Sequence, residues 1–227
     1  MPSNKELAIA GFYDGIYHFY GIANSFLTFG LDRWWRARAA GLAKEAAPGA
    51  LTALDACCGT GDLSLALRKA FGPGLELTGA DLSAAMLSAA KEKLPGMKFA
   101  LAEAKALPFP DAGFDLVTIA FAARNLNIDK GKLLAALREF SRVLKPGGLF
   151  LNLETTRLRN PALWFLMKLY VSALIGLLNL LSPKSSSSYN FLKDTILGFY
   201  DAGEFSALLA EAGFTCASFK TLCPGAV

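Results

Sequence analysis

Residues 51–154 alternate between short apolar runs and longer helix-forming stretches, and few architectures accommodate that alternation. The apolar runs are typical of buried strands and occupy residues 51–58, 75–82, 97–104, 114–122 and 149–154. The stretches between them predict helices at residues 63–70, 84–94 and 130–144. Strands that are apolar along their whole length and are separated by helices belong to a parallel sheet with helices on both faces. The sequence therefore predicts an α/β fold with a doubly wound, mostly parallel sheet.

The C-terminal part extends this pattern by one helix and one strand. Residues 204–212 predict a helix, because Asp201 and Glu204 have the spacing of a capping box. Residues 215–222 read as a further strand at the edge of the sheet. The chain stops at Val227, so we expect this last edge strand to be short or truncated. Two kinds of contact could cover such an exposed sheet edge, a homodimer contact or a membrane contact.

Two segments lie outside the alternation. Residues 12–36 are rich in aromatic side chains and predict a helical lid. Residues 161–183 are apolar apart from Lys168, and the serine run that follows at 185–188 predicts a flexible turn. The apolar segment is just long enough to cross a membrane, but Lys168 and Asn179 within it argue against a span. It fits either a buried helical hairpin over the sheet or an apolar lid that receives a lipid-like substrate or rests on a bilayer.

Composition excludes several classes of protein. Hydrophobic residues make up 53% and charged residues 19% of the 227 residues, which excludes extended disorder. The net charge of +4 is too weak to argue for a nucleic-acid partner. Four cysteines without a Cys-x-x-Cys pair, and a single histidine, argue against a metal site and a disulfide scaffold. No charged stretch leads into an apolar run at the N-terminus, so we expect no signal peptide and a cytoplasmic protein.

The strongest local signal is the segment 55–63, Asp-Ala-Cys-Cys-Gly-Thr-Gly-Asp-Leu, where a predicted strand gives way to a predicted helix. Asp55 lies near the end of the strand, and Gly59 and Gly61 let backbone amides in the loop approach a ligand closely. Asp81 lies twenty residues beyond Gly61, at the end of the next strand, where its carboxylate can accept both hydroxyls of a ribose. Ligands of doubly wound sheets bind at this edge, so we expect a nucleoside-containing cofactor there.

Two cofactor classes share this geometry. A dinucleotide fingerprint requires glycine or alanine where this chain has Ser64, and Asp62 would repel a pyrophosphate at the start of the helix. A nicotinamide reductase is therefore disfavoured. S-adenosylmethionine carries no phosphate, and its ammonium and sulfonium groups are cationic, so Asp55 and Asp62 suit it. A tight strand-to-helix turn without a ligand stays open as a purely structural alternative.

Several short elements of the chain carry a resemblance to a known family. They read Thr-Phe-Gly-Leu-Asp-Arg-Trp-Trp-Arg at 28–36, Cys-Cys-Gly-Thr-Gly-Asp at 57–62, Leu-Pro-Phe-Pro-Asp at 107–111, Phe-Ala-Ala-Arg-Asn-Leu at 121–126 and Tyr-Asn-Phe-Leu at 189–192. Together they resemble class I S-adenosylmethionine-dependent methyltransferases and, more narrowly, the C-methyltransferases of ubiquinone and menaquinone biosynthesis. The resemblance implies a Rossmann-like sheet of the seven-stranded type.

We expect a single methyltransferase domain over residues 1–227. Its parts are an N-terminal helical lid (1–45), a cofactor-binding core (46–155), an apolar helical insertion (156–200), and a C-terminal helix and edge strand (201–227).

The resemblance also implies which residues hold the cofactor. It implies that S-adenosylmethionine contacts Thr60, Asp81, Glu103, Ala104 and Ala120. The strand ends and the glycine loop add Asp55, Gly59, Gly61 and Leu82 to the predicted cofactor site. Ala120 stands where the family often has a serine, so its contact can only be apolar or through the backbone. Ala122 and Ala123 stand where the family commonly has a glycine, which leaves the shape of the pocket open.

The family's substrates resemble a ring hydroquinone with a polyisoprenoid tail, and the reaction needs no metal. Arg124 and Asn125 follow the fourth predicted strand, at the ligand edge of the sheet. We expect Arg124 to stabilise the phenolate, directly or through a water, and Asn125 to orient the ring. Tyr20 matches a tyrosine that would reach the substrate oxygen, although Gly21 replaces the aspartate that accompanies it in the family. Alternatively, Arg124 pairs with a neighbouring acid and takes no part in the chemistry.

Three functions fit these observations. The first is C-methylation of a polyprenylated hydroquinone, of the demethylmenaquinol or ubiquinol-precursor type, with residues 161–183 in peripheral contact with the inner face of the membrane. The second is a methyltransferase for another lipophilic small molecule, which the departures at Gly21, Ala120 and Ala122 favour. The third is a subunit of a biosynthetic complex that binds S-adenosylmethionine but is inactive.

Overall fold

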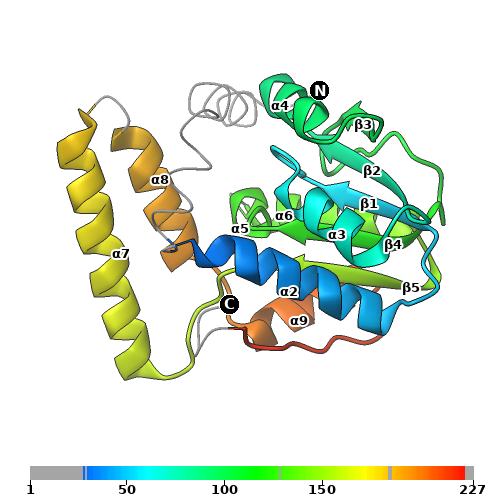
Figure 1. The fold of residues 1–227 in the computed structure, drawn as a ribbon. Helices are drawn as coiled ribbons and strands as arrows, with labels where there is room; N and C mark the ends of the chain where they lie inside the picture. The colour runs from blue at the N-terminus through cyan, green and yellow to red at the C-terminus, as the bar shows by residue number, and fades with distance from the viewer. Residues whose placement is uncertain (1–27, 29, 128, 184–185, 223–227) are drawn as a thin grey trace.

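A parallel sheet forms the centre of the computed structural model, which describes residues 28, 30–127, 129–183 and 186–222 (Figure 1). The described residues form five strands in the order β3-β2-β1-β4-β5, each parallel to its neighbours. The strands are β1 (Thr52–Ala56), β2 (Glu76–Asp81), β3 (Lys98–Leu101), β4 (Phe114–Ala120) and β5 (Leu144–Leu153). Each lies on one of the predicted apolar runs, although β5 begins five residues earlier than predicted. The prediction of an α/β fold with a doubly wound parallel sheet is confirmed.

Helices connect these strands and continue beyond them. They are α2 (Leu31–Ala46), α3 (Asp62–Phe71), α4 (Ala84–Lys93), α5 (Ala123–Leu126), α6 (Lys130–Val143), α7 (Pro161–Leu181), α8 (Ser186–Leu197) and α9 (Ala202–Glu211). Capping side chains explain where two of them begin. The Ser83 hydroxyl accepts a hydrogen bond from the Met86 amide at 3.1 Å, and Asp201 forms the predicted capping box with Glu204.

Successive side chains of the strands alternate between two cores. Ala53 of β1 packs with Leu116 of β4 under α2 and α3, whereas Leu54 packs with Val117 under α6 and α9. All four side chains are fully buried. Because helices cover both faces, the central strands carry apolar side chains on both sides, which is why their sequences are largely apolar runs without a strict alternation.

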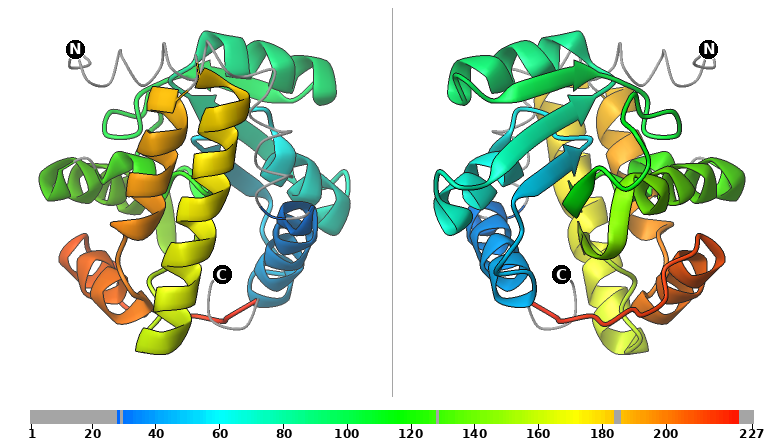
Figure 2. Two further views of the ribbon diagram at one scale, coloured as in Figure 1. Left: turned by 90° about the vertical axis from the view of Figure 1, so that its left-hand side faces the viewer. Right: turned by 90° about the vertical axis from the view of Figure 1, so that its right-hand side faces the viewer.

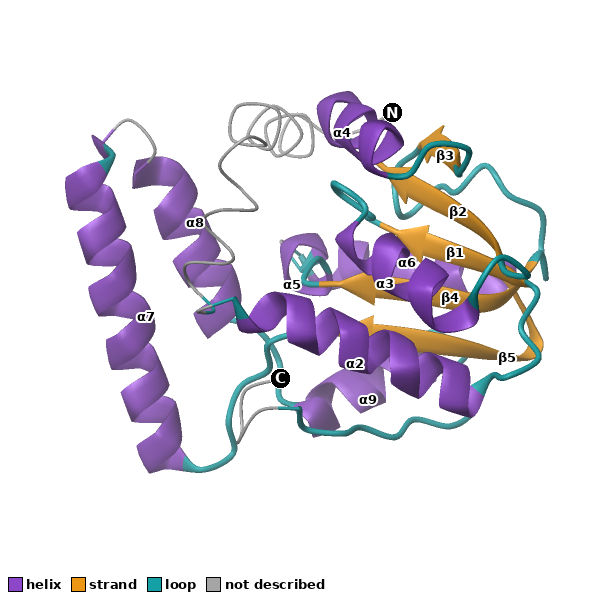
Figure 3. Cartoon of the chain, viewed as in Figure 1, coloured by secondary structure: helices purple, strands orange, loops and turns teal. Residues whose placement is uncertain are grey.

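The chain reverses its direction of winding between β1 and β4, which lie side by side in the centre of the sheet. Ligands of such sheets bind outside the carboxyl ends of the strands, at this point of reversal. The strand arrowheads in Figure 3 all point to the side on which α7 and α8 lie. The predicted cofactor loop, between β1 and α3, therefore opens toward those two helices.

Most of the apolar segment 161–183 forms one long helix, α7, which packs against α8 (Figure 2) and stands away from the sheet (Figure 1). Only Val171 and Ile175 of α7 are buried. The alternative of a hairpin buried over the sheet is therefore wrong, because α8 covers only a narrow strip of α7. The serine run does not form the predicted turn either, since residues 186–188 lie in the first turn of α8. Among the described residues, α7 is the one helix long and apolar enough to cross a membrane.

The predicted edge strand at 215–222 is wrong. These residues pair with no strand of the described part, and most of their side chains are exposed. Phe219, for example, is 62% exposed. An extended segment becomes a strand only where a neighbouring strand offers free backbone groups and a face to pack on. Among the described residues, 215–222 have neither. The described sheet accordingly has five strands, not the seven of the resemblance.

The predicted N-terminal lid divides into two parts. Residues 1–27 lie outside the described residues, so the lid over 1–27 stays a prediction. Helix α2, in contrast, packs against α3 and β5 and belongs to the helical layer of the core. Its side chains Trp35, Ala40 and Ala43 are buried there.

Candidate active site

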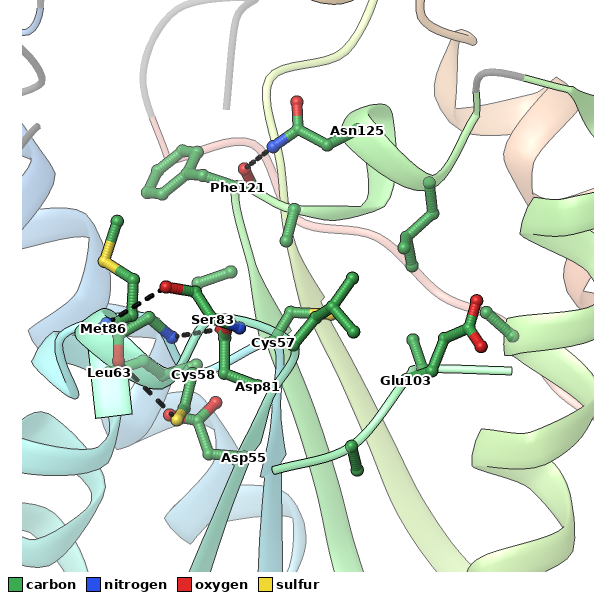
Figure 4. Close-up of a pocket in the computed structure, with 18 of the residues that line it drawn as sticks. Asp55, Cys57, Cys58, Leu63, Asp81, Ser83, Met86, Glu103, Phe121 and Asn125 are labelled. Carbon is green, nitrogen blue, oxygen red and sulfur yellow. Dashed lines mark hydrogen bonds between the residues drawn. The ribbon is translucent and has the colours of Figure 1, made fainter. Parts of the chain in front are cut away.

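The carboxyl ends of β1, β2 and β4 open into one cavity of about 1210 Å³, part of which is open to solvent. Every predicted cofactor residue except Gly61 lines the cavity: Asp55, Gly59, Thr60, Asp81, Leu82, Glu103, Ala104 and Ala120. Residues that are far apart in the sequence thus meet in one place, because the strand ends bring them together (Figure 4).

Gly59 and Gly61 have different structural roles in the loop. Gly59 has a φ of 53°, and a Cβ placed on it would meet nothing within 4 Å, so its backbone is open to a ligand. Gly61 has a φ of 78° and begins α3, where a Cβ would lie 3.0 Å from the Leu94 side chain. Close packing against α4, and not ligand contact, explains why glycine occupies position 61.

Asp81 joins the two loops that border the cavity. Its Oδ2 accepts a hydrogen bond from the Gly59 amide at 2.8 Å, and its Oδ1 accepts one from the Ser83 amide at 2.9 Å. Each carboxylate oxygen has two acceptor positions, so the same group can also accept from ligand hydroxyls. Figure 4 shows the Asp81 side chain in the middle of the lining residues. A ribose would find its acceptor here.

Asp55 is buried beneath the loop, with 1% of its surface exposed. The Ser64 hydroxyl donates to its Oδ2 at 2.5 Å, and the Thr118 hydroxyl donates to its Oδ1 at 2.9 Å. Burial raises the pKa of Asp55 to about 6, and the two hydroxyl hydrogen bonds only partly oppose that rise. Asp55 is therefore an acid that a nearby positive charge would readily ionise.

Asp62, the second acid near the loop, is already paired. The Lys93 ammonium lies 2.6 Å from its Oδ1, and the Thr60 hydroxyl donates to its Oδ2 at 3.1 Å. Burial would raise the pKa of Asp62, but the hydrogen bond and charge of Lys93 lower it below its ordinary value. Of the two acids, Asp55 is the one whose charge depends on what binds beside it.

Glu103 and Ala104 line the cavity after β3. The Glu103 carboxylate pairs with the Lys105 ammonium at 2.7 Å, and 17% of its side-chain surface is exposed. In Figure 4 it projects into the cavity, apart from Asp55. Glu103 and Asp81 line the same cavity, so the Glu103 carboxylate could accept from the exocyclic amine of an adenine whose ribose lies at Asp81.

Phe121 and Asn125 form the other wall of the cavity (Figure 4). Phe121 has a φ of 54°, a strained value for a residue with a side chain, and it directly follows β4. The Asn125 amide Nδ2 donates to the Phe121 carbonyl at 3.5 Å. Ala122 lies between them at the start of α5 with a φ of −125°, which alanine adopts without strain. Alanine in place of the family's glycine is therefore compatible with this backbone.

Arg124 turns away from the cavity. Its guanidinium forms a buried ion pair with Glu154, and the two side chains are 3% and 0% exposed. Glu154 also accepts from the Arg124 amide at 3.2 Å and from the Thr155 amide at 2.9 Å. This is the arrangement of the alternative prediction, in which Arg124 pairs with a neighbouring acid. Tyr20, the third predicted catalytic residue, lies outside the described residues.

The adjacent cysteines line the cavity without offering a nucleophile. Burial, reinforced by the charges of Asp55 and Asp81, raises the pKa of both Cys57 and Cys58 far above the ordinary value of a thiol. Both thiols are therefore protonated, and protonated thiols are poor nucleophiles. Cys57 has a φ of 51°, so the turn at the end of β1 is strained in the same way as the turn at Phe121.

Sequence reasoning missed several lining residues: Arg36, Ser83, Met86, Ala102, Lys105, Phe121, Leu126, Lys132 and Ala136. Most are ordinary small or apolar side chains, which no pattern marks. Arg36 did carry a signal. It shares one buried helical face with Asp32, Ala40 and Ala43, and a charged pair on an otherwise apolar face seldom serves packing alone.

The polar groups that line the cavity fit S-adenosylmethionine. Asp81 and Glu103 can accept from the ribose and the adenine, Gly59 leaves the backbone open to close approach, and Asp55 can attract the cationic part of the cofactor. When bound, this cofactor supplies an electrophilic methyl group. The parallel sheet and this site together define a class I S-adenosylmethionine-dependent methyltransferase.

Comparisons with known proteins narrow the class. The chain belongs to the ubiE/COQ5 methyltransferase family, whose model matches residues 1–227. It is 36% identical over 215 residues to a demethylmenaquinone methyltransferase of Staphylococcus aureus, covering 93% of this chain and 86% of that protein.

Solved structures agree on the fold. A S-adenosylmethionine-dependent methyltransferase from Clostridium acetobutylicum is 25% identical with a TM-score of 0.54, over 62% of this chain and 58% of that one. A possible histamine N-methyltransferase from Thermotoga maritima reaches a TM-score of 0.57 at 18% identity, over 90% of this chain and 81% of that one, and shows the fold alone. The protein is an S-adenosylmethionine-dependent methyltransferase.

We predict that the affinity for S-adenosylmethionine falls as the pH drops below about 6. Asp55 is ionised above its raised pKa of about 6 and neutral below it, and only the ionised form attracts the cationic cofactor. One proton is involved, so the loss should approach about tenfold per pH unit at most. Isothermal titration calorimetry between pH 5 and 8 measures it.

Two variants serve as references for that titration. Asp55→Asn should bind S-adenosylmethionine weakly at every pH and should show no fall in affinity near pH 6. Asp62→Asn should keep the fall, because the pKa of Asp62 is already lowered. A fall that survives in Asp55→Asn would assign it to another group and contradict the prediction.

Proposed function

We propose that this enzyme methylates a ring carbon of a lipophilic hydroquinone of the demethylmenaquinol type. One observation carries the proposal: α5, which lines part of the cofactor cavity, contacts an apolar helical hairpin formed by α7 and α8. Asn125 and Leu126 of the cavity wall belong to α5, and α5 contacts α8, which packs on α7. A ring in the cavity can thus extend an isoprenoid tail along apolar surface. The 36% identity to a demethylmenaquinone methyltransferase supports the naphthoquinol ring over a benzoquinol ring.

The substrate itself supplies the nucleophile. A hydroquinone that loses a hydroxyl proton becomes a phenolate, and the carbon beside the oxygen then carries negative charge. After that carbon has taken the methyl group, it loses its own proton and the ring regains its aromaticity. The protein contributes position and exclusion of water. Phe121 and Leu126 line the wall with apolar surface, which suits both tasks.

Asn125 is the residue we propose to contact the substrate ring. It lines the cavity from α5, and its side chain is held by the bond to the Phe121 carbonyl. An amide can hydrogen-bond a phenol or a phenolate without titrating itself. Tyr20 stays part of the proposal as a second contact to the substrate oxygen.

We propose Arg124 as a positioning residue. Its ion pair with Glu154 joins the start of α5 to the end of β5, so it fixes the element that carries Asn125. The original prediction, that Arg124 stabilises the phenolate directly or through a water, requires the guanidinium to leave Glu154. Breaking a buried ion pair costs about 3–5 kcal/mol. The positioning role is favoured because it leaves the ion pair between Arg124 and Glu154 intact.

The substrate is tested with methyl-labelled S-adenosylmethionine. We expect label in the ring carbon of a short-tailed, chemically reduced demethylated naphthoquinol, and much less in the matching benzoquinol. Label in the benzoquinol alone would overturn the choice of ring. Label in neither, with the cofactor still bound in calorimetry, would favour a methyltransferase for another lipophilic molecule or an inactive subunit.

A variant pair separates contact from positioning. We predict that Asn125→Ala lowers kcat/KM for the quinol by about 10- to 100-fold, the range for loss of one hydrogen bond to a charged group. Affinity for S-adenosylmethionine should stay within about threefold of the wild type. Asn127→Ala is the matched control, because Asn127 follows α5 and is not among the lining residues. An equal loss in both variants would contradict the role of Asn125.

Arg124 is examined through its partner. A positioning role predicts similar losses for Arg124→Gln and Glu154→Gln, since each breaks the same ion pair, with an unchanged pH profile of kcat. Direct stabilisation of the phenolate predicts a much larger loss in Arg124→Gln and a profile shifted to higher pH. Thermal unfolding of both variants shows whether enough folded protein remains for the comparison.

We further propose that α7 rests on the membrane from the cytoplasmic side. Its outward face is apolar along its length, with Phe165 65%, Leu169 58%, Leu180 77% and Leu181 70% exposed. The helix contains no acidic residue, and its single charge, Lys168, lies over the Trp164 ring at 5.6 Å. Tryptophan and lysine together are typical of helices at the membrane interface.

A membrane span is the less suitable arrangement, because both ends of α7 return to one domain. Leu153, at the end of β5, is buried before the helix begins. After the helix, Phe199 and Phe205 are buried in the same core as Ile119 of β4. A span would place these partners on opposite sides of the bilayer. A helix lying in the interface leaves the core intact.

We predict that Phe165→Glu combined with Leu169→Glu weakens binding to phosphatidylcholine–phosphatidylglycerol vesicles by at least about tenfold, since each buried apolar side chain contributes roughly 1.5–3 kcal/mol. Vesicle sedimentation measures it. Leu101→Glu is the control, because Leu101 is equally exposed, at 63%, on β3. Unchanged binding in the double variant would exclude the membrane role. A wild type that forms a dimer, which the double variant breaks, would assign the face to a second copy.

A further inference from the structure

Arg36 is the one side chain of α2 that reaches the cofactor cavity. It lies in the fourth position after Asp32, so both point from the same face of the helix toward the core. Only 8% of the Arg36 surface is exposed. A guanidinium is rarely buried to this degree unless its donors have defined partners.

The guanidinium is held on two sides. The Asp32 carboxylate accepts from its Nη1 at 2.5 Å, and Asp32 in turn accepts from the Thr28 hydroxyl at 3.3 Å. The Phe121 ring lies on the other side, with its centroid 5.0 Å from the Arg36 Cζ. Arg36 has five N–H donors. Within the described residues, Asp32 is its only protein acceptor, and Arg36 lines the cavity, so its other donors are available to a ligand there.

We propose that Arg36 binds the carboxylate of the methionine part of S-adenosylmethionine. This proposal rests on the cofactor and not on the identity of the methyl acceptor. A guanidinium presents two parallel N–H groups that match a carboxylate in the plane, and one edge of Arg36 is already used by Asp32. The other edge is left for a second carboxylate. That carboxylate is the only anionic group of the cofactor.

The position of Arg36 along the cavity supports the assignment. Asp81 and Glu103 are acceptors for the ribose and the adenine, so the methionine part belongs at the other end, near the loop between β1 and α3. Arg36 lies at that end. Its charge opposes the rise that burial causes in the pKa of Asp55, and it also acts on Asp62. Asp55 then faces the cationic groups and Arg36 the anionic group of the same amino-acid moiety.

The other cations of the cavity wall are less suitable. Lys105 is paired with Glu103, at the adenine end. Lys132 lies on α6, which covers the opposite face of the sheet from α2. Neither lies beside the loop that follows β1.

The experiment compares two cofactors that differ only in the carboxylate. Calorimetry measures the affinity of the wild type, Arg36→Met and Arg36→Lys for S-adenosylmethionine and for decarboxylated S-adenosylmethionine. We expect the wild type to prefer the complete cofactor by about 10- to 100-fold, the range for charge-assisted hydrogen bonds. Arg36→Met should lose that preference to within about threefold, and Arg36→Lys should keep part of it.

Arg33→Met is the control, since Arg33 lies on the same helix but is exposed. A similar loss for both cofactors in Arg36→Met would overturn the proposal and assign Arg36 to packing. A variant that fails to fold is recognised by its thermal unfolding, and Asp32→Asn then replaces it. Asp32→Asn keeps the Arg36 guanidinium but removes the carboxylate that holds it in place. It should therefore reduce the preference for the complete cofactor without abolishing it. Quinol turnover plays no part in this measurement, so failure of the proposed substrate leaves it intact.

Discussion

The hydrogen bonds of one carboxylate join the parts of this site. Asp81 ends β2, yet it accepts from the amide of Gly59, which follows β1, and from the amide of Ser83, which caps α4. Three elements that are separate in the sequence are thereby held at one strand edge. The arrangement is possible because a parallel sheet brings all carboxyl ends to the same side. Asp81 also lines the cavity, so the residue that joins these elements also belongs to the surface of the site.

Backbone strain marks the borders of the same cavity. Cys57 and Phe121 have left-handed φ angles of 51° and 54° although both carry side chains. Each directly follows a central strand, where the chain must turn sharply to avoid covering the strand end. Such residues cost of order 1–3 kcal/mol, and the surrounding packing must hold them. For Phe121 that packing includes the ring of Trp35 and the guanidinium of Arg36, which ties α2 to the site.

The sequence predicted the five described strands and the order of elements, because buried parallel strands leave continuous apolar runs. Eight of the nine residues predicted to hold the cofactor line the cavity, because ligands of such sheets bind at the strand ends. Prediction from the sequence failed where the outcome depends on neighbours. Residues 215–222 have the composition of a strand but no partner edge among the described residues, and Arg124 has the position of a catalytic group but lies beside Glu154. Neither the missing partner nor the nearby acid is visible in a local pattern. For Arg36 the sequence does show the spacing of four residues from Asp32, but the burial of that pair becomes evident only once α2 is placed against the sheet.

Helix α7 shows that an apolar sequence can form an exposed helix as well as a buried one. Its composition equals that of a buried helix, but only α8 packs on it, so most of the surface stays exposed. Exposed apolar surface of this extent is costly in water and gains by contact with lipid. The hairpin leads to α5, whose residues Asn125 and Leu126 line the cavity. On the function proposed above, a substrate dissolved in the bilayer would need no passage through water to reach the methyl donor, and the charged cofactor would enter the cavity from the solvent. The strand ends would then serve two ligands of opposite solubility, because they lie between the polar loop after β1 and α5, which contacts the apolar hairpin.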